Sequence, residues 1–308
     1  MRPLTIGIRP PHDLFDRGAA ALREGISRIE AAGIDRVCVG DHVSFHGGRG
    51  FDGLVQATAL GAISDLEVQT AVYLLPLRHP VPVARQVNSL AQIAPGRFVF
   101  GVGIGGEDPN EIAMCGVDPT TRGRRMDESM DIVRRLLSGE AVTVAGEFFD
   151  ITDARVLPVP PSPVPIQVGG RSAAALRRAG RLGDGYLALW TTPERFVTAV
   201  ADVLAHAEEA GRLDVDWRHG LQVWCGFDDD AASARRALAG EMERLYEVPF
   251  EKFERYCPFG APEAVAGELT PFVEAGCRDI NIIPVAGSTD DATEGVAEVC
   301  RILTARFP

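Results

Sequence analysis

The chain has 308 residues, of which 46% are hydrophobic and 24% are charged, as in an average globular protein. This composition excludes a disordered, a collagen-like and a disulfide-dense chain, and the length suits two ordinary domains or one large α/β barrel. The formal net charge is −12, from 31 basic and 43 acidic residues. We expect no nucleic-acid partner, because phosphate contacts need a concentrated basic face.

No apolar run reaches the roughly 20 residues that a membrane-spanning helix needs, and the N-terminal residues lack the apolar segment of a signal peptide. We therefore expect a cytoplasmic protein without a membrane partner. The six cysteines have no paired spacing, so neither a metal site nor a redox motif is predicted. Lys252 is the only lysine and stands in a charged stretch, which disfavours a catalytic or phosphate-loop lysine.

Apolar, β-branched runs alternate with helix-periodic stretches along the chain, as parallel strands joined by crossover helices do. The predicted strands are residues 4–9, 36–40, 68–75, 98–103, 165–168, 186–190, 221–227 and 279–284. The predicted helices are residues 17–32, 53–62, 82–93, 123–137, 172–182, 193–210, 231–246, 262–275 and 291–305. Eight such units without an internal linker predict a single TIM (β/α)8 barrel domain over residues 1–308, rather than a doubly wound sheet plus a second domain.

Two connections are longer than βα loops usually are, and both follow predicted strands. They cover residues 107–122 and 228–276, which we expect to form insertions at the C-terminal rim, where active sites of this architecture lie. Residues 139–151 resemble a small hairpin outside the barrel. The proline-rich residues 157–165 predict a stiff connector, with a domain boundary there as the alternative.

The second predicted strand ends at Asp41 and His42. A histidine at the rim can exchange protons near neutral pH, so His42 is a candidate catalytic residue, with a structural histidine as the alternative. His46 follows four residues later, but in a glycine-containing loop that does not suit a metal pair. Arg78 and His79 follow the third strand, where we expect them to begin the next helix and to face solvent or its cap.

Gly101, Gly103 and Gly106 have the spacing of a dinucleotide-binding fingerprint. Residues 107–110 interrupt the helix that this fingerprint needs, so we reject a Rossmann fold. The glycines instead leave backbone that a flat ring can approach closely. Glu107 then projects from the rim as a candidate proton donor or acceptor, with a solvated loop carboxylate as the alternative.

The fifth predicted strand is followed by Gly169, Gly170, Arg171 and Ser172, and then by a helix. Glycine backbone, a serine N-cap and a helix N-terminus form a candidate phosphate cradle, although a plain capped turn would have the same pattern. The nearby Arg177, Arg178 and Arg181 would reduce the repulsion of an anionic ligand by this acidic chain. Trp190 and Trp224 could line a ring pocket, but packing in the barrel is the more frequent use.

Taken in order, several segments resemble the bacterial luciferase-like family, most closely its branch that uses the deazaflavin coenzyme F420. They are Asp41-His42, PLRHP at 76–80, GRFVFGVGIGG at 96–106, RGRRMDES at 122–129, PIQVGGRS at 165–172, GDGY at 183–186, FGAPEAV at 259–265 and AGCRDINI at 275–282. The resemblance covers residues 35–285, nearly the whole chain.

This resemblance implies a TIM-type barrel with the cofactor ring across its C-terminal mouth. His42 and Glu107 would flank the reactive carbon as proton donors or acceptors, and Gly169 and Gly170 would receive the cofactor phosphate. A non-prolyl cis peptide is implied at Ala71-Val72, and no metal site is implied. The cofactor-binding residues would be Asp41, Ala71, Val72, Gly103, Gly105, Gly106, Asn110, Gly169, Gly170, Arg171 and Ser172.

The implied reaction is hydride transfer between coenzyme F420 and a small organic substrate, either an alcohol/carbonyl pair or an activated double bond. Two alternatives remain: an FMN-dependent monooxygenase that uses dioxygen, and a non-catalytic flavin-binding protein. Sugar-phosphate dehydrogenases of this branch have tryptophan at the position of His46 and a lysine near Thr192, so we do not expect glucose 6-phosphate oxidation. The resemblance also implies a homodimer. The mostly apolar residues 53–63 could form its interface, but burial within a single chain explains their composition equally well.

Overall fold

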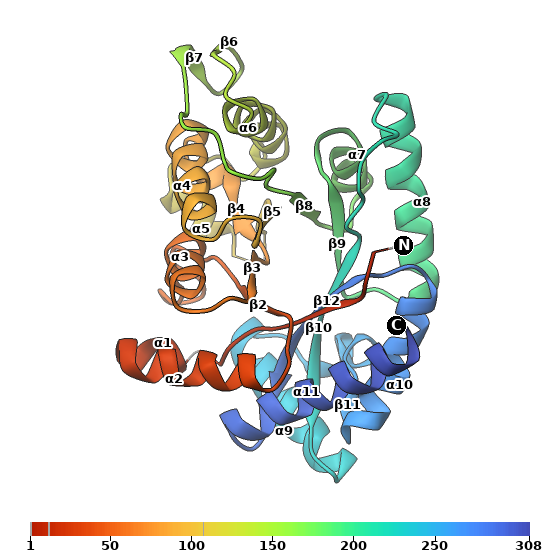
Figure 1. Ribbon diagram of the computed structural model, residues 1–308. Coiled ribbons are helices and arrows are strands. Elements are labelled where there is room, and N and C mark those ends of the chain that lie inside the picture. The colour runs from red at the N-terminus through yellow and green to blue at the C-terminus, as the bar shows by residue number, and fades with distance from the viewer. Residues whose placement is uncertain (1, 12, 107) are drawn as a thin grey trace. The chain divides into compact units, whose positions relative to one another are not determined.

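The protein is described here by a computed structural model, which covers residues 2–11, 13–106 and 108–308. Glu107, one of the two predicted catalytic residues, lies outside the described residues. Parallel strands alternate with helices along the chain (Figure 1), and the fold is the TIM-type (β/α)8 barrel that the sequence predicts. In the described residues its eight main strands are β1 (Thr5–Ile8), β2 (Arg36–Val39), β3 (Glu67–Thr70), β5 (Phe98–Gly103), β8 (Ile166–Gly169), β9 (Gly185–Leu189), β10 (Gly220–Phe227) and β12 (Asp279–Val285).

The long helices lie close to their predicted positions, because all but one have an apolar face with helical periodicity, and residues 53–63 form an almost wholly apolar run. They are α2 (Gly18–Ala31), α3 (Gly53–Ile63), α4 (Pro80–Ile93), α6 (Arg122–Leu137), α7 (Ala173–Leu182), α8 (Pro193–Glu209), α9 (Ala231–Tyr246), α10 (Pro262–Glu274) and α11 (Thr289–Arg306). The shorter elements α1 (Asp13–Asp16) and α5 (Pro109–Met114) were not predicted, since they are too short to show a period. None of the helices in the described part of the chain has the length and apolar character needed to cross a membrane.

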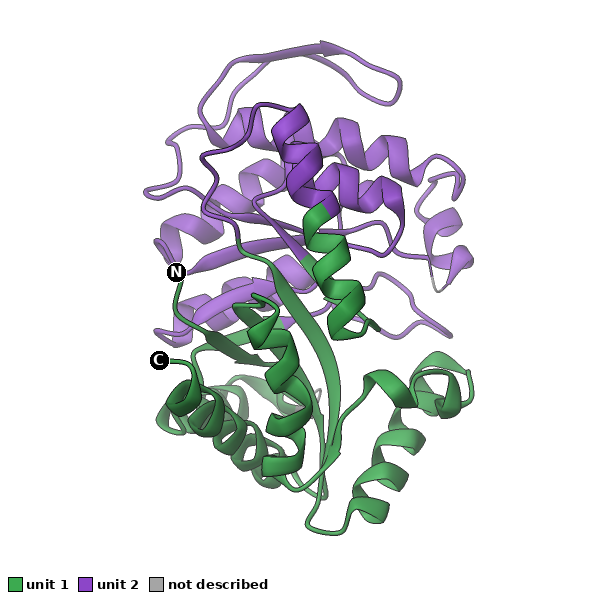
Figure 2. Ribbon diagram, turned by 90° about the vertical axis from the view of Figure 1, so that its right-hand side faces the viewer, with its two compact units in different colours: residues 1–38, 187–201, 218–308 green, residues 39–186, 202–217 purple. Residues whose placement is uncertain are grey.

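The described chain divides into two compact units (Figure 2). Unit 1 comprises Met1–Cys38, Leu187–Ala201 and Arg218–Pro308, and unit 2 comprises Val39–Tyr186 and Asp202–Trp217. In unit 1, β12 pairs in parallel with both β1 and β10, and β10 also pairs with β9 and with the short β11 (Phe259–Gly260). In unit 2, β5 pairs in parallel with β3, with the short β4 (Tyr73–Leu74) and with β8.

A buried ionic cluster joins strand starts within unit 1. Arg36, the first residue of β2, pairs with Asp279, the first residue of β12, and both side chains are fully buried. Arg218 Nη2 lies 3.3 Å from Asp279 Oδ1, and Arg36 Nη1 donates to Asn281 Oδ1 at 3.2 Å. Burial would raise the pKa of Asp279, but Arg36 and Arg218 outweigh it and lower this pKa. Charges at the amino ends of strands indicate a role in stability, because the carboxyl ends carry the chemistry in this fold.

The third predicted strand is interrupted. Residues 68–75 form β3 and β4 with a cis peptide at Ala71-Val72 between them, as the resemblance implies, and a 3-10 turn (Leu75–Leu77) follows. A Cβ atom added to Gly101 would overlap the Thr70 carbonyl oxygen, and one on Gly103 would overlap Val72 Cγ2. The space that a side chain would occupy at these two glycines is therefore filled by the neighbouring strand. Close approach of a ring to their backbone stays a prediction.

The additional hairpin is confirmed. Strands β6 (Val142–Ala145) and β7 (Asp150–Ala154) pair antiparallel in a sheet of their own. Its turn is fixed by Glu128 of α6, whose carboxylate accepts hydrogen bonds from the backbone N–H groups of Phe148 and Phe149, at 3.1 and 3.0 Å. The proline-rich connector that follows contains a second cis peptide, Leu157-Pro158.

Candidate active site

His42 is held by a carboxylate that the sequence analysis did not identify. Its Nδ1 lies 3.0 Å from Oε2 of Glu111, on α5. A carboxylate only accepts hydrogen bonds, so the proton of this bond belongs to Nδ1, and Nε2 of the neutral ring is left as an acceptor. The His42 side chain is 30% exposed while that of Glu111 is 3% exposed, so the ring reaches solvent from a buried anchor.

The same carboxylate also holds the loop that carries the histidine. Glu111 Oε1 accepts hydrogen bonds from the backbone N–H groups of Val43, at 2.6 Å, and Ser44, at 3.1 Å. Burial would raise the pKa of Glu111, but the hydrogen bonds from His42 and these two backbone groups outweigh it and lower this pKa. The anchor therefore stays negatively charged beside the imidazole and fixes the position of the ring.

Helix α5 exists because its first residues are strong helix-start signals. Asp108 is its N-cap and accepts from Asn110 N at 2.9 Å, and Pro109 occupies the first turn. Asp108 also accepts from His46 N at 3.0 Å, so two carboxylates clamp the loop after His42. We expected residues 107–110 to leave no room for a helix, but α5 does begin at Pro109. It starts too late to complete a dinucleotide fingerprint. The Asp-x-x-Glu spacing of Asp108 and Glu111 is a capping signal that could have revealed it.

Asp41, the residue before the histidine, is a structural anchor of the site. Its buried carboxylate accepts hydrogen bonds from Gly53 N and Leu74 N, both at 2.9 Å, and pairs through both oxygens with Arg78. Arg78 also lies over the Tyr73 ring, with 4.4 Å from Cζ to the ring centroid. We expected Arg78 to contact solvent or a helix cap, but it pairs with Asp41 instead. Contact of Asp41 with a cofactor stays a prediction. His79 caps α4 as expected, accepting from Val81 N at 3.3 Å.

Aromatic contacts fix one side of the imidazole. The ring of Phe45 stacks on His42 with 4.2 Å between centroids, and His46 contacts Phe45 edge-on at the same centroid distance. The backbone of His46 has a φ of 31°, so the loop turns sharply there. The three rings follow one another on the loop after β2, and His46 thereby lies close to the candidate catalytic group.

The predicted phosphate cradle forms the N-terminal end of α7. Ser172 is its N-cap, with Oγ accepting from Ala175 N at 3.2 Å, and Gly170 has a φ of 132°, which favours glycine. Gly170, Arg171 and Ser172 are exposed. The first N–H groups of a helix have no intrahelical partner, so this exposed turn lies at the positive end of the dipole of α7.

Val72 connects the cradle to the interrupted strand. A Cβ atom added to Gly169 would lie 3.0 Å from Val72 Cγ1, while Gly103 packs against the other methyl group of Val72. Within unit 2 the structure thus brings together Val72, Gly103 and Gly169, three residues of the predicted cofactor-binding set. Asn110 is exposed in the first turn of α5, but no contact of its side chain identifies a role.

Arg122 is a further candidate that the sequence analysis did not identify. Gly105 and Gly106 have positive φ values of 66° and 143°, and a Cβ atom added to Gly106 would lie 3.1 Å from Arg122 Nη2. Arg122 Nε is buried and has no hydrogen-bond partner among the described residues. A positive group with an unused donor beside a bare backbone fits an anionic or carbonyl-bearing ligand. No cluster of metal-ligating side chains occurs in the described part of the chain.

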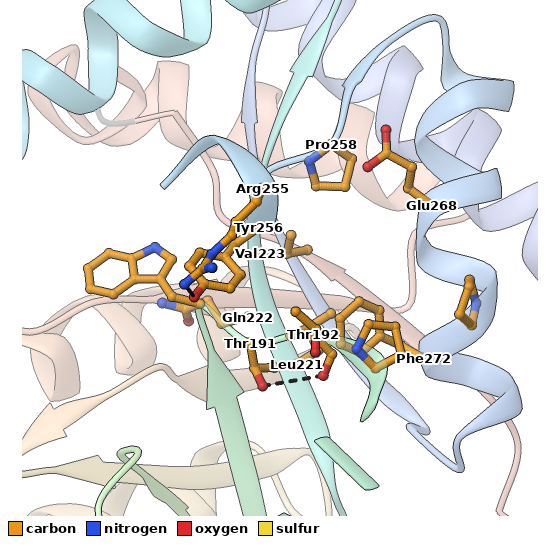
Figure 3. Close-up of a pocket in the computed structure, with 13 residues that line it drawn as sticks. Thr191, Thr192, Leu221, Gln222, Val223, Arg255, Tyr256, Pro258, Glu268 and Phe272 are labelled. Atoms are coloured by element: carbon orange, nitrogen blue, oxygen red, sulfur yellow. Dashed lines mark hydrogen bonds between the residues drawn. The ribbon is translucent and has the colours of Figure 1, made fainter. Parts of the chain in front are cut away.

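Both tryptophans under consideration belong to an aromatic cluster in unit 1. Trp190 contacts Tyr246 and Phe253 at centroid distances of 5.2 and 4.7 Å, and Trp224 Nε1 donates to the Tyr246 hydroxyl at 3.2 Å. Trp190 also lines a cavity of about 270 Å³ (Figure 3). This cavity has apolar walls from Leu221, Val223 and Phe272, with polar groups from Thr191, Thr192, Arg255, Tyr256 and Glu268. Trp190 therefore both packs in the aromatic cluster and lines the cavity.

Residues 8–278 match the family described as luciferase-like monooxygenase. The chain belongs to this family. An uncharacterised protein of Mycobacterium tuberculosis is 40% identical over 159 residues. The aligned part covers 51% of this chain and 54% of that relative, so the chain spans about half the length of the relative. The F420-dependent glucose-6-phosphate dehydrogenase of Kribbella flavida is 30% identical over 308 aligned positions, which cover 89% of this chain and 90% of the relative.

Solved structures of similar fold include an F420-dependent dehydrogenase and a monooxygenase. An F420-dependent secondary alcohol dehydrogenase in complex with an F420-acetone adduct has a TM-score of 0.83 and 22% identity, covering 97% of this chain and 98% of the other. The monooxygenase RslO1 from Streptomyces bottropensis has a TM-score of 0.82 and 19% identity, covering 99% of this chain and all of the other. At these identities the likeness establishes the luciferase-like fold.

Proposed function

We propose that this luciferase-like protein is an oxidoreductase that transfers a hydride between coenzyme F420 and a small organic substrate. The substrate class is an alcohol/carbonyl pair or an activated double bond. The observation that carries the proposal is the His42–Glu111 pair, which leaves Nε2 of a partly exposed imidazole as a proton acceptor at the rim. The names of the Kribbella flavida relative and of the alcohol dehydrogenase structure support the choice of cofactor.

The residues of unit 2 fit such a cofactor. The backbone donors at Gly170, Arg171 and Ser172 would hold its phosphate at the N-terminus of α7. The unused Nε of Arg122, beside Gly106, would meet an acceptor atom of the ring system. A bound deazaflavin supplies the hydride chemistry, while the protein orients it and manages the proton.

The protein's own contribution is then the transfer of one proton. In the oxidation of an alcohol, His42 Nε2 accepts the hydroxyl proton, and the Glu111 carboxylate stabilises the imidazolium that results. In the reverse direction the same nitrogen returns the proton to the carbonyl oxygen. Phe45 keeps the ring in place, because it packs against one face of the imidazole. Glu107 as a second proton donor or acceptor remains a part of the proposal that rests on the resemblance alone.

An FMN-dependent monooxygenase is the second candidate, favoured by the description of the family and by the similarity to RslO1. The two candidates differ in their use of oxygen, because reduced FMN reacts with dioxygen and a deazaflavin reacts poorly. Reduced-cofactor assays with an oxygen electrode separate them, and binding without turnover of any substrate would favour a non-catalytic flavin-binding protein. We further propose that the protein is cytoplasmic and forms a homodimer. Light scattering of the purified protein tests whether it is a dimer.

The proposal is tested by His42→Ala, with F420 absorbance followed during turnover of a panel of alcohols, ketones and conjugated alkenes. We expect kcat to fall by roughly 10²–10⁴ with little change in cofactor affinity, since the imidazole moves a proton and does not hold the cofactor. His206→Ala is the matched control, because His206 also pairs with a glutamate, Glu209, at 3.0 Å on α8. Equal turnover in both variants and the wild type would remove His42 from the mechanism.

A further inference from the structure

The cavity in unit 1 that Trp190 lines has a wall of buried apolar side chains (Figure 3). Leu221 and Val223 stand two positions apart on β10, so both side chains lie on the same face of the sheet. Phe272 of α10 also lines the cavity, and all three side chains are buried. The volume of about 270 Å³ is slightly below that of ordinary ligand pockets, so a small organic molecule fits.

The charged side chains that line the cavity are one arginine and one glutamate. Arg255 belongs to the 3-10 turn η3 (Glu254–Tyr256), and Glu268 belongs to α10. In the view of Figure 3 they lie on opposite sides of the cavity, with Pro258 between them. The lining therefore carries no net charge, but it has a positive side and a negative side.

Neither charge is neutralised within the part of the chain that the structure describes. Arg255 donates to the Tyr256 hydroxyl and lies over the Tyr256 ring, with 4.5 Å from Cζ to the ring centroid, but it pairs with no carboxylate there. Arg195 Nη1 lies 3.5 Å from the same hydroxyl, which adds a second positive group on this side. Burial raises the pKa of Glu268, and no positive group among the described residues lowers it.

The Glu268 carboxylate lies near the interior of unit 1, although the residue is partly open to solvent. Its charge adds to burial in raising the pKa of the Cys257 thiol to about 12, and it contributes to the raised pKa of Cys225. Both thiols are buried. A ligand in the cavity can therefore meet this carboxylate at the edge of the apolar wall.

We propose that this cavity binds a small zwitterion in which an apolar chain separates an amine from a carboxylate, as in an ω-amino acid. The ammonium group pairs with Glu268, the carboxylate pairs with Arg255, and the methylene groups lie against Leu221, Val223 and Phe272. A simple cation or a simple anion would leave one of the two charges without a partner. The inference goes beyond the proposed hydride transfer, because it uses no residue of unit 2.

The test is calorimetric titration of the complete protein with glycine, β-alanine, 4-aminobutyrate, 5-aminopentanoate and 6-aminohexanoate. We expect affinity to rise from glycine to the longer members, since charges on opposite sides of a cavity need a ligand of matching length. The best member should have a Kd of about 0.1–10 mM, as a ligand of so few atoms allows. Pentanoate and butylamine each lack one charge of 5-aminopentanoate, and each should bind about three- to tenfold more weakly.

Two variants test the two ends of the ligand separately. In Glu268→Gln the preference for 5-aminopentanoate over pentanoate should disappear, and in Arg255→Gln the preference over butylamine should disappear. Glu263→Gln and Arg236→Gln are the matched controls, because they remove exposed charges of α10 and α9 outside the cavity and should bind as the wild type does.

Three results would overturn the proposal. One is the absence of binding of every member of the series up to about 50 mM, and another is equal affinity of the wild type for the zwitterion and for its two singly charged analogues. The third is an unchanged preference in either cavity variant, since each end of the ligand would then lack its assigned partner. None of these results bears on hydride transfer, which His42→Ala tests independently.

Discussion

Replacing Glu111 by glutamine tests the positioning of the candidate catalytic histidine. The amide oxygen of the new side chain can still accept from Val43 and Ser44, and its NH2 group then faces His42 Nδ1. That NH2 group donates, so the proton of the neutral ring must move from Nδ1 to Nε2. The Glu111→Gln variant therefore keeps the shape of the site and removes the proton acceptor.

The magnitude follows from the three hydrogen bonds that the carboxylate accepts. Each changes from a charge-assisted to a neutral hydrogen bond, a loss of roughly 1 kcal/mol, so the free energy of unfolding should fall by about 3 kcal/mol. Turnover should fall by roughly 10²–10⁴, the usual contribution of a general base. Cofactor affinity should change little, because Glu111 is placed behind the histidine.

Long-range ¹H–¹⁵N spectra of the histidine ring measure the tautomer directly and need no substrate. We expect His42 to carry its neutral-state proton on Nδ1 in the wild type and on Nε2 in Glu111→Gln. Glu243→Gln is the control, since Glu243 accepts a backbone hydrogen bond from Phe250 at 2.9 Å in unit 1. An unchanged tautomer together with unchanged turnover would refute the assigned role of Glu111.

Two further predictions concern stability. Asp279→Asn leaves Arg36 and Arg218 in the interior without their carboxylate, so urea unfolding should show a loss of about 3–5 kcal/mol, and a loss below about 1 kcal/mol would contradict the description of the cluster. The pKa of Glu111 is lower in the folded state than its ordinary value of about 4.3, so its contribution to stability is present above that pH and is lost as the pH falls through the folded value. The stability of the wild type should therefore fall more steeply with decreasing pH than that of Glu111→Gln. Acid unfolding curves of the same shape for the two proteins would contradict this prediction.

The barrel could be predicted because its signals are local. Buried parallel strands appear as short apolar runs, and the crossover helices have apolar faces with a 3.6-residue period. The same reasoning placed Ser172 at the start of α7, since a serine after two glycines and before an alanine-rich run has the pattern of a cap. The interruption at Ala71-Val72 has no local signal and came from the resemblance to a family.

The candidate site could be predicted only in part because its contacts are long-range. His42 and Glu111 are 69 positions apart, and only the folded loop brings them together. The pairing of Asp41 with Arg78 has the same origin. The packing of Gly101 against Thr70 and of Gly103 against Val72 could not be predicted, because a sequence does not show which neighbour fills the space beside a glycine.

The most direct test of the account is a side-by-side titration of the purified protein with F420 and FMN, followed by fluorescence. If the rim of unit 2 holds a deazaflavin, F420 should bind with a Kd in the micromolar range or below, and FMN at least about tenfold more weakly. Tighter binding of FMN, or no binding of F420, would contradict the proposed function.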